Sequence, residues 1–256
     1  MRSVRDCRVF ENEPNIRVLY RMSSGCGRNP VSNFNNRLCF LNCQAAFPNS
    51  HFYAVLDNAD ESCESIMEET GTPYEMTNLG NAGAYTRSLD IITEKSSNGE
   101  WNLNDIVYFA ENDYCHRPEA EDALLEGMHI SDYVTLYDHP DKYDSEQIHY
   151  GMHYSDIKAK LYLGRSGYWR STTSTCATYG TTVNVLLEDM EIHRKFCEGW
   201  ATMQDCAMFH ALIETRKRSL ISPMPGFATH GEVNCLAPYI DWKRVLDETR
   251  IVGEKI

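Results

Sequence analysis

The chain has 256 residues, of which 42% are hydrophobic and 24% charged, and its formal net charge is −13. This length and composition are typical of a folded protein with a buried core, and they exclude a disordered chain. The acidic balance argues against nucleic acid as a partner, because phosphate backbones are bound by clustered Lys and Arg. No run of about 18 apolar residues is present, and the first residues lack an apolar signal segment. We therefore expect a soluble, cytoplasmic protein without a membrane segment.

Strand-like and helical segments alternate along the first half of the chain. This alternation predicts an α/β fold with a mostly parallel, Rossmann-like sheet flanked by helices. In such sheets, ligands bind at the carboxyl ends of the strands. The predicted strands are Ile16–Tyr20, His51–Leu56, Pro73–Thr77 and Asp105–Ala110, and the predicted helices are Asn35–Phe47, Glu61–Thr70, one that includes Ala82 to Ile92, and one that starts at Pro118.

The pattern changes after residue 131. We interpret the Pro- and Gly-rich segment 221–231 as an irregular loop, followed by a short tail around Trp242. No internal repeat or linker divides the chain, so we expect a single domain over residues 1–256. The other predicted elements of this half are a strand at Asp132–Tyr137, a hairpin at Lys158–Ser174, and helices at Thr182–Cys197 and Thr202–Thr215.

Ten cysteines are scattered along the chain. A protein of this length does not need disulfide staples, so we interpret most of them as reduced, buried thiols. Cys39 and Cys43 are four residues apart in a helical pattern, but no other Cys or His pair has zinc-finger spacing. We therefore do not expect a structural zinc site.

Glu111, Asn112 and Asp113 form an acidic turn directly after the most strand-like run of the chain. Two carboxylates at the end of a buried strand can approach a hard divalent cation such as Mg²⁺ or Mn²⁺, which prefers oxygen ligands. Such a cation would neutralise charge on a departing phosphate. The alternative is an ordinary polar turn, since Asn and Asp are common turn residues. Arg21, Asp57 and the segment 78–83 follow other predicted strands and belong to the same sheet edge.

The order of these segments resembles the donor-binding half of GT-A glycosyltransferases, in particular the large inverting group that carries a DxD motif. The resemblance covers about residues 16–137 and rests on IRVLY, HFYAVLDNAD, NLGNAGAYTRSLD and DIVYFAENDY. It implies a metal-dependent transfer of a sugar, with inversion, from a nucleoside diphosphate donor to a hydroxyl of a glycan or glycoconjugate. We expect a UDP-sugar as donor, bound by a half at about 14–137, and an acceptor-binding half at about 138–256.

The resemblance also assigns roles to individual residues. Asp57 corresponds to the acid that binds the base or ribose, and Arg87 to an arginine that faces the nucleotide or supports the metal-binding carboxylates. Asp113 corresponds to the last acid of the DxD motif, whereas Glu111 replaces the usual first Asp and could reach the ribose or the metal through water. The alternatives for Asp57 and Arg87 are a helix cap and a structural ion pair. The expected nucleotide-site residues are Arg21, Asp57, Asn78, Arg87, Glu111, Asn112 and Asp113.

Two residues of the second half complete the implied site. Asp205, in the helix MQDCAMFHAL, is similar to the acid that inverting enzymes use to deprotonate the acceptor hydroxyl. Its alternative is a capping box with Thr202. His230 is similar to the late histidine that completes the metal site, with Asp113 and Glu111, in several GT-A families. An imidazole ligand would favour Mn²⁺ over Mg²⁺, and the alternative is an ordinary polar residue.

Aromatic residues gather in the region expected to bind the acceptor. Flat rings suit the apolar faces of sugars, although Tyr and Trp also fill protein cores. We take Trp169 as the preferred acceptor contact. The other aromatic residues of this region are Tyr150, Tyr154, Tyr168 and Tyr179.

Three other functions remain open at this point. A retaining glycosyltransferase would not need Asp205 as base. A sugar-phosphate nucleotidyltransferase would carry a Gly-rich loop with Arg and Lys after the first strand, which SSGCGRNP matches poorly. A catalytically silent binding module would bind the nucleotide or sugar without transfer.

Overall fold

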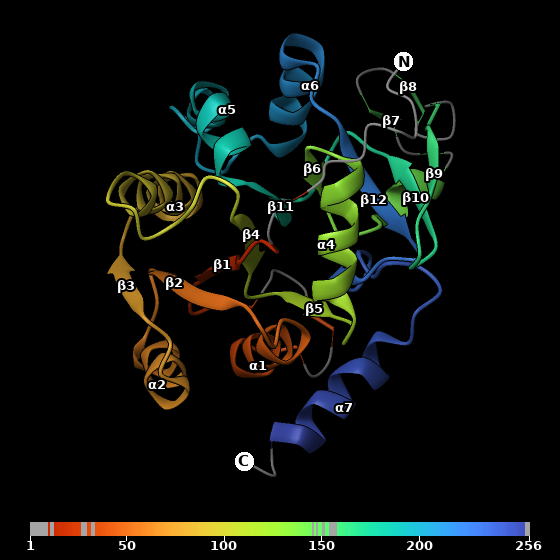
Figure 1. The fold of residues 1–256 in the computed structure, drawn as a ribbon. Coiled ribbons are helices and arrows are strands. Elements are labelled where there is room, and N and C mark those ends of the chain that lie inside the picture. The colour runs from red at the N-terminus through yellow and green to blue at the C-terminus, as the bar shows by residue number, and fades with distance from the viewer. Residues whose placement is uncertain are drawn as a thin grey trace.

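A nine-stranded sheet forms the centre of the molecule, and both halves of the chain contribute strands to it (Figure 1). The structure is a computed structural model that describes residues 10, 13–26, 30–31, 34–144, 146, 148–149, 152–153 and 158–253. In spatial order the strands are β3 (Tyr74–Thr77), β2 (His51–Asp57), β1 (Ile16–Met22), β4 (Ile106–Glu111), β11 (Tyr179–Thr182), β6 (Tyr133–Val134), β12 (Leu220–Met224), β10 (Tyr168–Ser171) and β9 (Leu161–Leu163).

Strand direction differs between the two sides of this sheet. β3, β2, β1 and β4 run parallel to one another, whereas β11 is antiparallel to both β4 and β6. β12 runs parallel to β6. On its other side β12 pairs with β10, and β10 pairs with β9, and both of these pairings are antiparallel. Two short ladders lie outside the main sheet: β5 (Tyr114–His116) with β13 (Ala228–His230), and β7 (Ile148–His149) with β8 (Met152–His153). The predicted α/β fold with a Rossmann-like sheet is confirmed.

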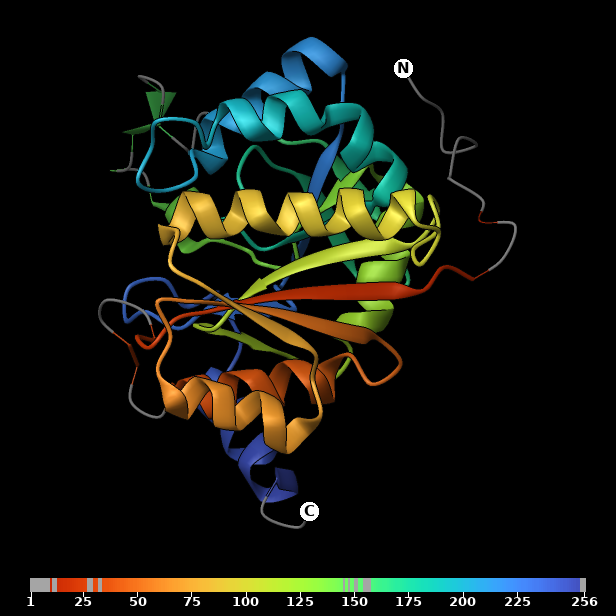
Figure 2. The same cartoon turned by 90° about the vertical axis from the view of Figure 1, so that its left-hand side faces the viewer.

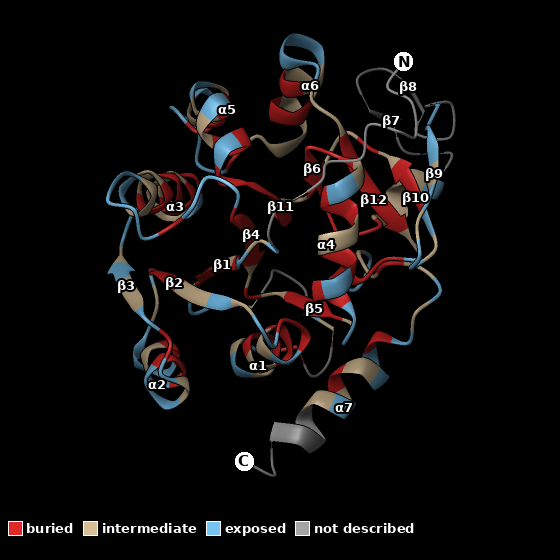
Figure 3. Ribbon diagram, viewed as in Figure 1, coloured by how far each residue is buried: buried red, intermediate tan, exposed pale blue. Residues whose placement is uncertain are grey.

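Helices cover both faces of the sheet, as Figure 2 shows. Adjacent residues of β1 point to opposite faces, so Val18 and Tyr20 belong to one core cluster and Leu19 to the other. Figure 3 shows that the central strands are buried and that exposed residues lie on the outer sides of the helices. The helices on the face of Leu19 are α3 (Gly80–Ser97), α5 (Val183–Lys195) and α6 (Asp205–Arg216), and those on the other face are α1 (Asn36–Ala46), α2 (Glu61–Thr70), α4 (Ala120–Ile130) and α7 (Trp242–Gly253).

Local signals set the helix ends. The side chain of Asn35 caps α1 by accepting a hydrogen bond from the backbone N–H of Leu38 at 2.9 Å. Gly71 ends α2 in the left-handed conformation, with a φ of 64°. Pro118, expected at the first helical position, lies in the turn before α4, which begins at Ala120. No helix in the described part of the chain is both long and apolar enough to cross a membrane.

The interpretation of segment 221–231 as an irregular loop is wrong, because it contains most of β12 and all of β13. Pro223 stands opposite Trp169 on β10, whereas β12 pairs with β6 only through Leu220 and Ile221. At Pro223 the strand therefore has a neighbour on one side only, and proline is tolerated at such edge positions. The expected tail around Trp242 is also wrong, since this segment forms α7 and packs against α1.

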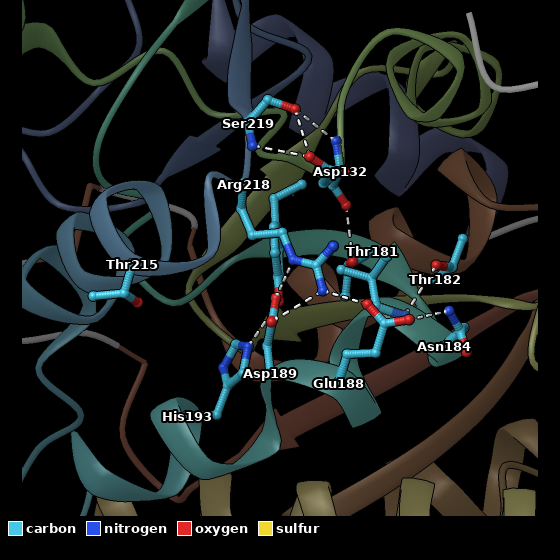
Figure 4. A network of polar contacts seen from close by, with 12 residues as sticks. Asp132, Thr181, Thr182, Asn184, Glu188, Asp189, His193, Thr215, Arg218 and Ser219 are labelled. Carbon is cyan, nitrogen blue, oxygen red and sulfur yellow. Dashed lines mark hydrogen bonds and ion pairs between the residues drawn. The ribbon is translucent and has the colours of Figure 1, made fainter.

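A buried polar cluster connects α5 with the strands beneath it (Figure 4). The ring nitrogens of His193 lie 2.8 Å from the Tyr85 hydroxyl and 3.0 Å from the Tyr133 hydroxyl. The Asp189 carboxylate accepts hydrogen bonds from Tyr133 at 2.9 Å and from Arg218 at 2.7 Å and 3.0 Å. Asp189 and His193 are both 0% exposed. The guanidinium of Arg218 therefore compensates the negative charge of a fully buried carboxylate, that of Asp189.

The burial of His193 predicts sensitivity to acid. Burial lowers the pKa of His193 from 6.5 to about 3, so the folded protein keeps the ring neutral while the unfolded chain binds a proton. The contribution of this neutral ring to the free energy of unfolding is therefore fully present above about pH 6.5. It decreases by about 1.4 kcal/mol per pH unit as the pH falls from there toward 3. We expect His193→Gln to reduce the pH dependence of the free energy of unfolding by about this amount between pH 3 and 6.5. Urea denaturation at several pH values measures it. The matched change His51→Gln, at an exposed histidine, should leave the slope unchanged. An unaltered slope in H193Q would contradict a neutral, buried His193.

Candidate functional site

A cleft lies at the carboxyl ends of β1, β2 and β4, beside the start of α3. β1 ends one residue after Arg21, β2 ends at Asp57 and β4 ends at Glu111. Ligands of α/β proteins bind at this edge of the sheet. The cleft therefore unites several residues that were predicted from strand ends. Its lining includes Arg21, Ser23, Asp57, Asn58, Asn81 and Glu111.

Arg21 and Glu111 form an ion pair between the ends of β1 and β4. The guanidinium Nη2 lies 2.6 Å from Glu111 Oε1, and Nη1 donates to the carbonyl of Asn81 at 3.2 Å. Arg21 is only 5% exposed and also lies over the ring of Tyr85. Burial raises the pKa of Glu111, against the opposing charge of Arg21, and the charge of Asp113 raises it further. Glu111 thus belongs to the site, with its carboxylate held by an arginine.

Asp57 holds the turn that leads into α3. Its Oδ1 accepts hydrogen bonds from the Thr77 hydroxyl at 2.8 Å and from the Leu79 backbone N–H at 2.7 Å. Asp57 is buried and lines the cleft, and the cap of α2 is Asp60, so the helix-cap alternative for Asp57 is wrong. Asn78 lies in the same turn, with its side chain exposed at the sheet edge.

Asn112 fixes the acidic turn from inside. Its side-chain amide donates to the carbonyl of Gly25 at 2.7 Å, to Asn36 Oδ1 at 2.7 Å and to the carbonyl of Ser23 at 3.2 Å. These bonds tie the turn to the segment after β1 and to the first residue of α1. Asn112 therefore supports the positions of its neighbours Glu111 and Asp113.

Asp113 and His230 are brought together by the ladder of β5 and β13. His230 pairs with Tyr114 across this ladder, which places its Nε2 3.1 Å from Asp113 Oδ2. The backbone N–H of Gly231 donates to the Asp113 carbonyl at 2.7 Å. Burial by itself lowers the pKa of His230, but the hydrogen bond and the charge of Asp113 outweigh it, so the pKa is raised.

The surroundings of Asp113 fit a divalent cation. Its Oδ1 is buried and has no hydrogen-bond partner in the described part of the chain. Neighbouring ligands of an octahedral Mg²⁺ lie about 3 Å apart, because each is about 2.1 Å from the ion. The observed separation of Asp113 Oδ2 and His230 Nε2, 3.1 Å, agrees with this spacing. Asp113 and His230 could therefore hold a metal ion together.

Glu232 and Cys235 extend this group of possible ligands. One candidate ligand atom from each of His230, Glu232 and Cys235 lies within 4.8 Å of the other two. Neither residue is among the candidates predicted from the sequence, where Cys235 is one of ten scattered cysteines. The spacing of His, Glu and Cys in HGEVNC is the signal that could have indicated them.

Asp205 lies at the start of α6 and binds the segment 175–177. Its carboxylate accepts hydrogen bonds from the backbone N–H groups of Thr175 at 2.8 Å, Cys176 at 3.0 Å and Ala177 at 3.3 Å, and from the Thr175 hydroxyl. The residue before α6 is Gln204, and no side chain caps this helix, so the capping box with Thr202 is absent. Met203, two residues before Asp205, donates its backbone N–H to Asn81 Oδ1 at 3.3 Å, so the segment that leads into α6 lies beside a residue of the cleft lining.

Arg87 does not bind the carboxylates of the acidic turn. It lies on α3, where its guanidinium donates to Glu75 at 2.7 Å and 3.0 Å and to Glu94 at 2.6 Å and 3.3 Å. Glu75 belongs to β3, so this network joins the helix to the edge strand of the sheet. The structural ion pair, considered as the alternative from sequence, is what the structure contains.

Trp169 is part of the core, which corrects its assignment as an acceptor contact. It is 0% exposed and lies opposite Pro223 in the sheet, while its neighbour Tyr168 is 59% exposed. Alternate residues of a strand face opposite sides, and the outward side here is that of Tyr168. Tyr179 is also fully buried. Tyr150 and Tyr154 lie outside the described residues.

No protein-family model matches the chain, and no curated protein matches its sequence. The chain is similar in structure to a CMP:2-keto-3-deoxy-manno-octonic acid synthetase complexed with CTP, with a TM-score of 0.51 and 12% identity over 94% of this chain and 100% of that one. It is also similar to glucosyl-3-phosphoglycerate synthase from Mycobacterium tuberculosis in complex with Mg²⁺ and UDP, with a TM-score of 0.47 and 10% identity over 82% of this chain and 68% of that one. A third similar structure is 4-diphosphocytidyl-2C-methyl-D-erythritol synthase, with a TM-score of 0.47 and 9% identity over 94% of this chain and all (100%) of that one.

The first of these similarities shows the fold. The chain shares its Rossmann-like α/β fold with that synthetase. Fold alone does not identify the reaction, because one architecture hosts many activities. The reaction must be inferred from the residues of the cleft.

Proposed function

We propose that the protein is a metal-dependent glycosyltransferase that moves a sugar from a nucleoside diphosphate donor to a hydroxyl of a glycan or glycoconjugate, with inversion. A UDP-sugar is the donor that we expect. The nucleotide occupies the cleft at the ends of β1, β2 and β4, and Mn²⁺ or Mg²⁺ is held by Asp113 and His230.

The pairing of Asp113 with His230 is the observation that carries this proposal. These residues are far apart in the sequence, and the 3.1 Å contact between them forms only because β13 pairs with β5. A late histidine beside the last acid of the DxD motif is what the glycosyltransferase resemblance implied. A nucleotidyltransferase would instead be expected to carry a basic Gly-rich loop after the first strand, and an acid–histidine pair is not among its expected features.

The residues of the cleft have separate tasks in this proposal. When bound, a divalent cation supplies positive charge for the diphosphate that departs with the nucleotide. Arg21 keeps a second positive charge at the cleft while its pairing holds Glu111 in place. Asp57 offers an acid at the end of β2 for the ribose or base, and its hydrogen bonds to Thr77 and Leu79 keep it rigid.

Asp205 is the proposed base for the acceptor hydroxyl. Its position at the start of α6, two residues after the contact of Met203 with Asn81, supports a place beside the cleft. Its oxygens accept hydrogen bonds from the segment 175–177, and a base must offer one oxygen to the acceptor. The proposed mechanism therefore requires this segment to release one of the two oxygens when the acceptor binds.

The direct test is a panel of nucleotide sugars, incubated with and without Mn²⁺. We expect one UDP-sugar to release UDP in a metal-dependent way, and NMR of the transferred sugar to show inverted anomeric configuration. Retained configuration would identify a retaining enzyme. Pyrophosphate release from a nucleoside triphosphate and a sugar phosphate would identify a nucleotidyltransferase. Binding of UDP without turnover of any donor would indicate a silent module and contradict the proposal.

The metal preference provides a second prediction. Replacing His230 by asparagine exchanges an imidazole ligand for an oxygen ligand, and imidazole favours Mn²⁺ relative to Mg²⁺. We expect His230→Asn to lower the rate of UDP release with Mn²⁺ by about tenfold to 100-fold, the usual effect of disturbing the groups around a metal ion. With Mg²⁺ the rate should fall by less. The measurement is the ratio of rates with the two ions. An unchanged ratio would remove His230 from the metal site.

A further inference from the structure

A second cavity, separate from the cleft, carries three cationic side chains. It lies between β10, the segment around Lys142 and helix α6, and Lys142, Lys158 and Arg170 contribute the positive charges. Ser171, Thr172 and Thr173 line the same space. In a chain of net charge −13, such a concentration of cations and hydroxyl donors is unusual and requires an explanation.

The donors of this cavity are not all used within the protein. Arg170 is only 9% exposed and donates to Asp138 at 2.8 Å, yet its Nε has no hydrogen-bond partner among the described residues. The hydroxyl of Thr172, a residue that is 6% exposed, also lacks one. Both atoms have almost no accessible surface, so a ligand would recover the cost of these unpaired donors only if its binding moved Arg170 and Thr172 toward the cavity.

The charges of the cavity are only partly balanced. Asp138 pairs with Arg170, and Asp141 lies 3.9 Å from Lys142, whose ammonium donates to the Ser174 hydroxyl at 3.0 Å. Lys158 is exposed at the rim. An anion is therefore the ligand that the local charge favours.

The wall of the cavity leads toward the segment that contains Asp113. Thr173 belongs to the cavity, and three residues later the carbonyl of Cys176 accepts a hydrogen bond from Tyr114, the residue after Asp113. Three residues span at most about 11 Å. Asp205 binds the backbone of the same segment. A ligand in the cavity would therefore lie near the segment whose backbone Asp205 binds.

We propose that this cavity binds a phosphate group of the acceptor. This inference rests on the proposed function, because it assigns the ligand to the acceptor half. Lysine, arginine and hydroxyl donors from several directions match the three or four acceptor oxygens of a tetrahedral phosphate better than the two oxygens of a carboxylate. The acceptor is then a phosphorylated glycan, or another phosphate ester that carries a free hydroxyl.

Binding of inorganic phosphate to the full chain tests the site. The protein is kept in EDTA, so that no metal recruits phosphate to the cleft, and at constant ionic strength. The thermal midpoint is then followed against phosphate concentration, with acetate as the anion control. We expect saturable stabilisation by phosphate and little by acetate. Parallel titrations with glycerol 3-phosphate and dimethyl phosphate distinguish a monoester from a diester as the natural group.

The variants Lys158→Gln and Lys142→Gln should each weaken phosphate binding by about threefold to tenfold, the effect of losing one charge-assisted contact. Lys158 is exposed, so its variant should fold normally. Lys243→Gln is the matched control, because Lys243 is exposed on α7, away from β9 and β10 (Figure 1). UDP and Mn²⁺ should bind K158Q as they bind the wild type.

Two results would overturn the inference: no saturable stabilisation of the wild type by phosphate, or equal stabilisation of the wild type, K158Q and K142Q. A different result would show that the proposed glycosyltransferase function is wrong while the phosphate site is right. In that case the wild type does not bind UDP with Mn²⁺, although phosphate still binds and still depends on Lys158.

Discussion

Replacing Asp113 by asparagine is expected to lower metal-dependent release of UDP from the donor sugar by about 1000-fold, or about 4 kcal/mol in the activation barrier. The reason is that Asp113 supplies a carboxylate that contacts His230 directly and whose other oxygen has no hydrogen-bond partner among the described residues. Asparagine has nearly the same shape, so the turn held by Asn112 should persist. The measurement is the initial rate of UDP release at saturating Mn²⁺.

The matched control for this change is Asp122→Asn. Asp122 is an exposed acid in the first turn of α4, remote from the cleft lining. We expect D122N to retain wild-type rates, and D113N to retain the wild-type thermal midpoint to within a few degrees. If D113N is as active as D122N, Asp113 does not hold a catalytic metal.

Replacing Asp205 by asparagine is expected to lower sugar transfer to the acceptor by about 100-fold or more, because the acceptor hydroxyl loses its base. Binding of UDP and Mn²⁺ should change little, since Asp205 does not line the nucleotide cleft. The readout is kcat for transfer, compared with the dissociation constant of UDP by calorimetry.

A second variant separates catalysis from support of the segment 175–177. Thr175→Val removes the hydroxyl that donates to Asp205 but keeps the backbone hydrogen bonds. If Asp205 is the base, T175V should keep kcat within about threefold, because the carboxylate remains. If Asp205 only anchors the segment, T175V and D205N should both lower the thermal midpoint. The loss of kcat in each variant should then be in proportion to its decrease in thermal midpoint.

The strands of the first half could be predicted from the sequence because they are short apolar runs that end on polar residues. The apolar residues of IRVLY and DIVYFA are buried in the structure, and the ends of these strands supply Arg21 and Glu111 to one cleft. The resemblance to GT-A glycosyltransferases also implied that Asp113 and His230 would share a metal site. It did not indicate how, since the pairing of β5 with β13 depends on two short segments far apart in the chain.

Other features required tertiary information. A tyrosine and a tryptophan in succession do not reveal which of them faces the core, and burial of Trp169 is decided by packing against the rest of the sheet. Arg87 is directed by Glu75, a residue on a neighbouring strand. By contrast, α7 had a readable signal: Trp242, Val245, Leu246 and Thr249 recur at helical spacing.

A crystal soaked with Mn²⁺ and UDP, measured at a wavelength where manganese scatters anomalously, tests the central claim most directly. We predict one strong anomalous peak about 2 Å from a carboxylate oxygen of Asp113 and from Nε2 of His230, with the diphosphate beside it and the ribose toward Asp57. A peak coordinated by other residues, or UDP bound elsewhere with no ion at Asp113, would contradict the proposed site.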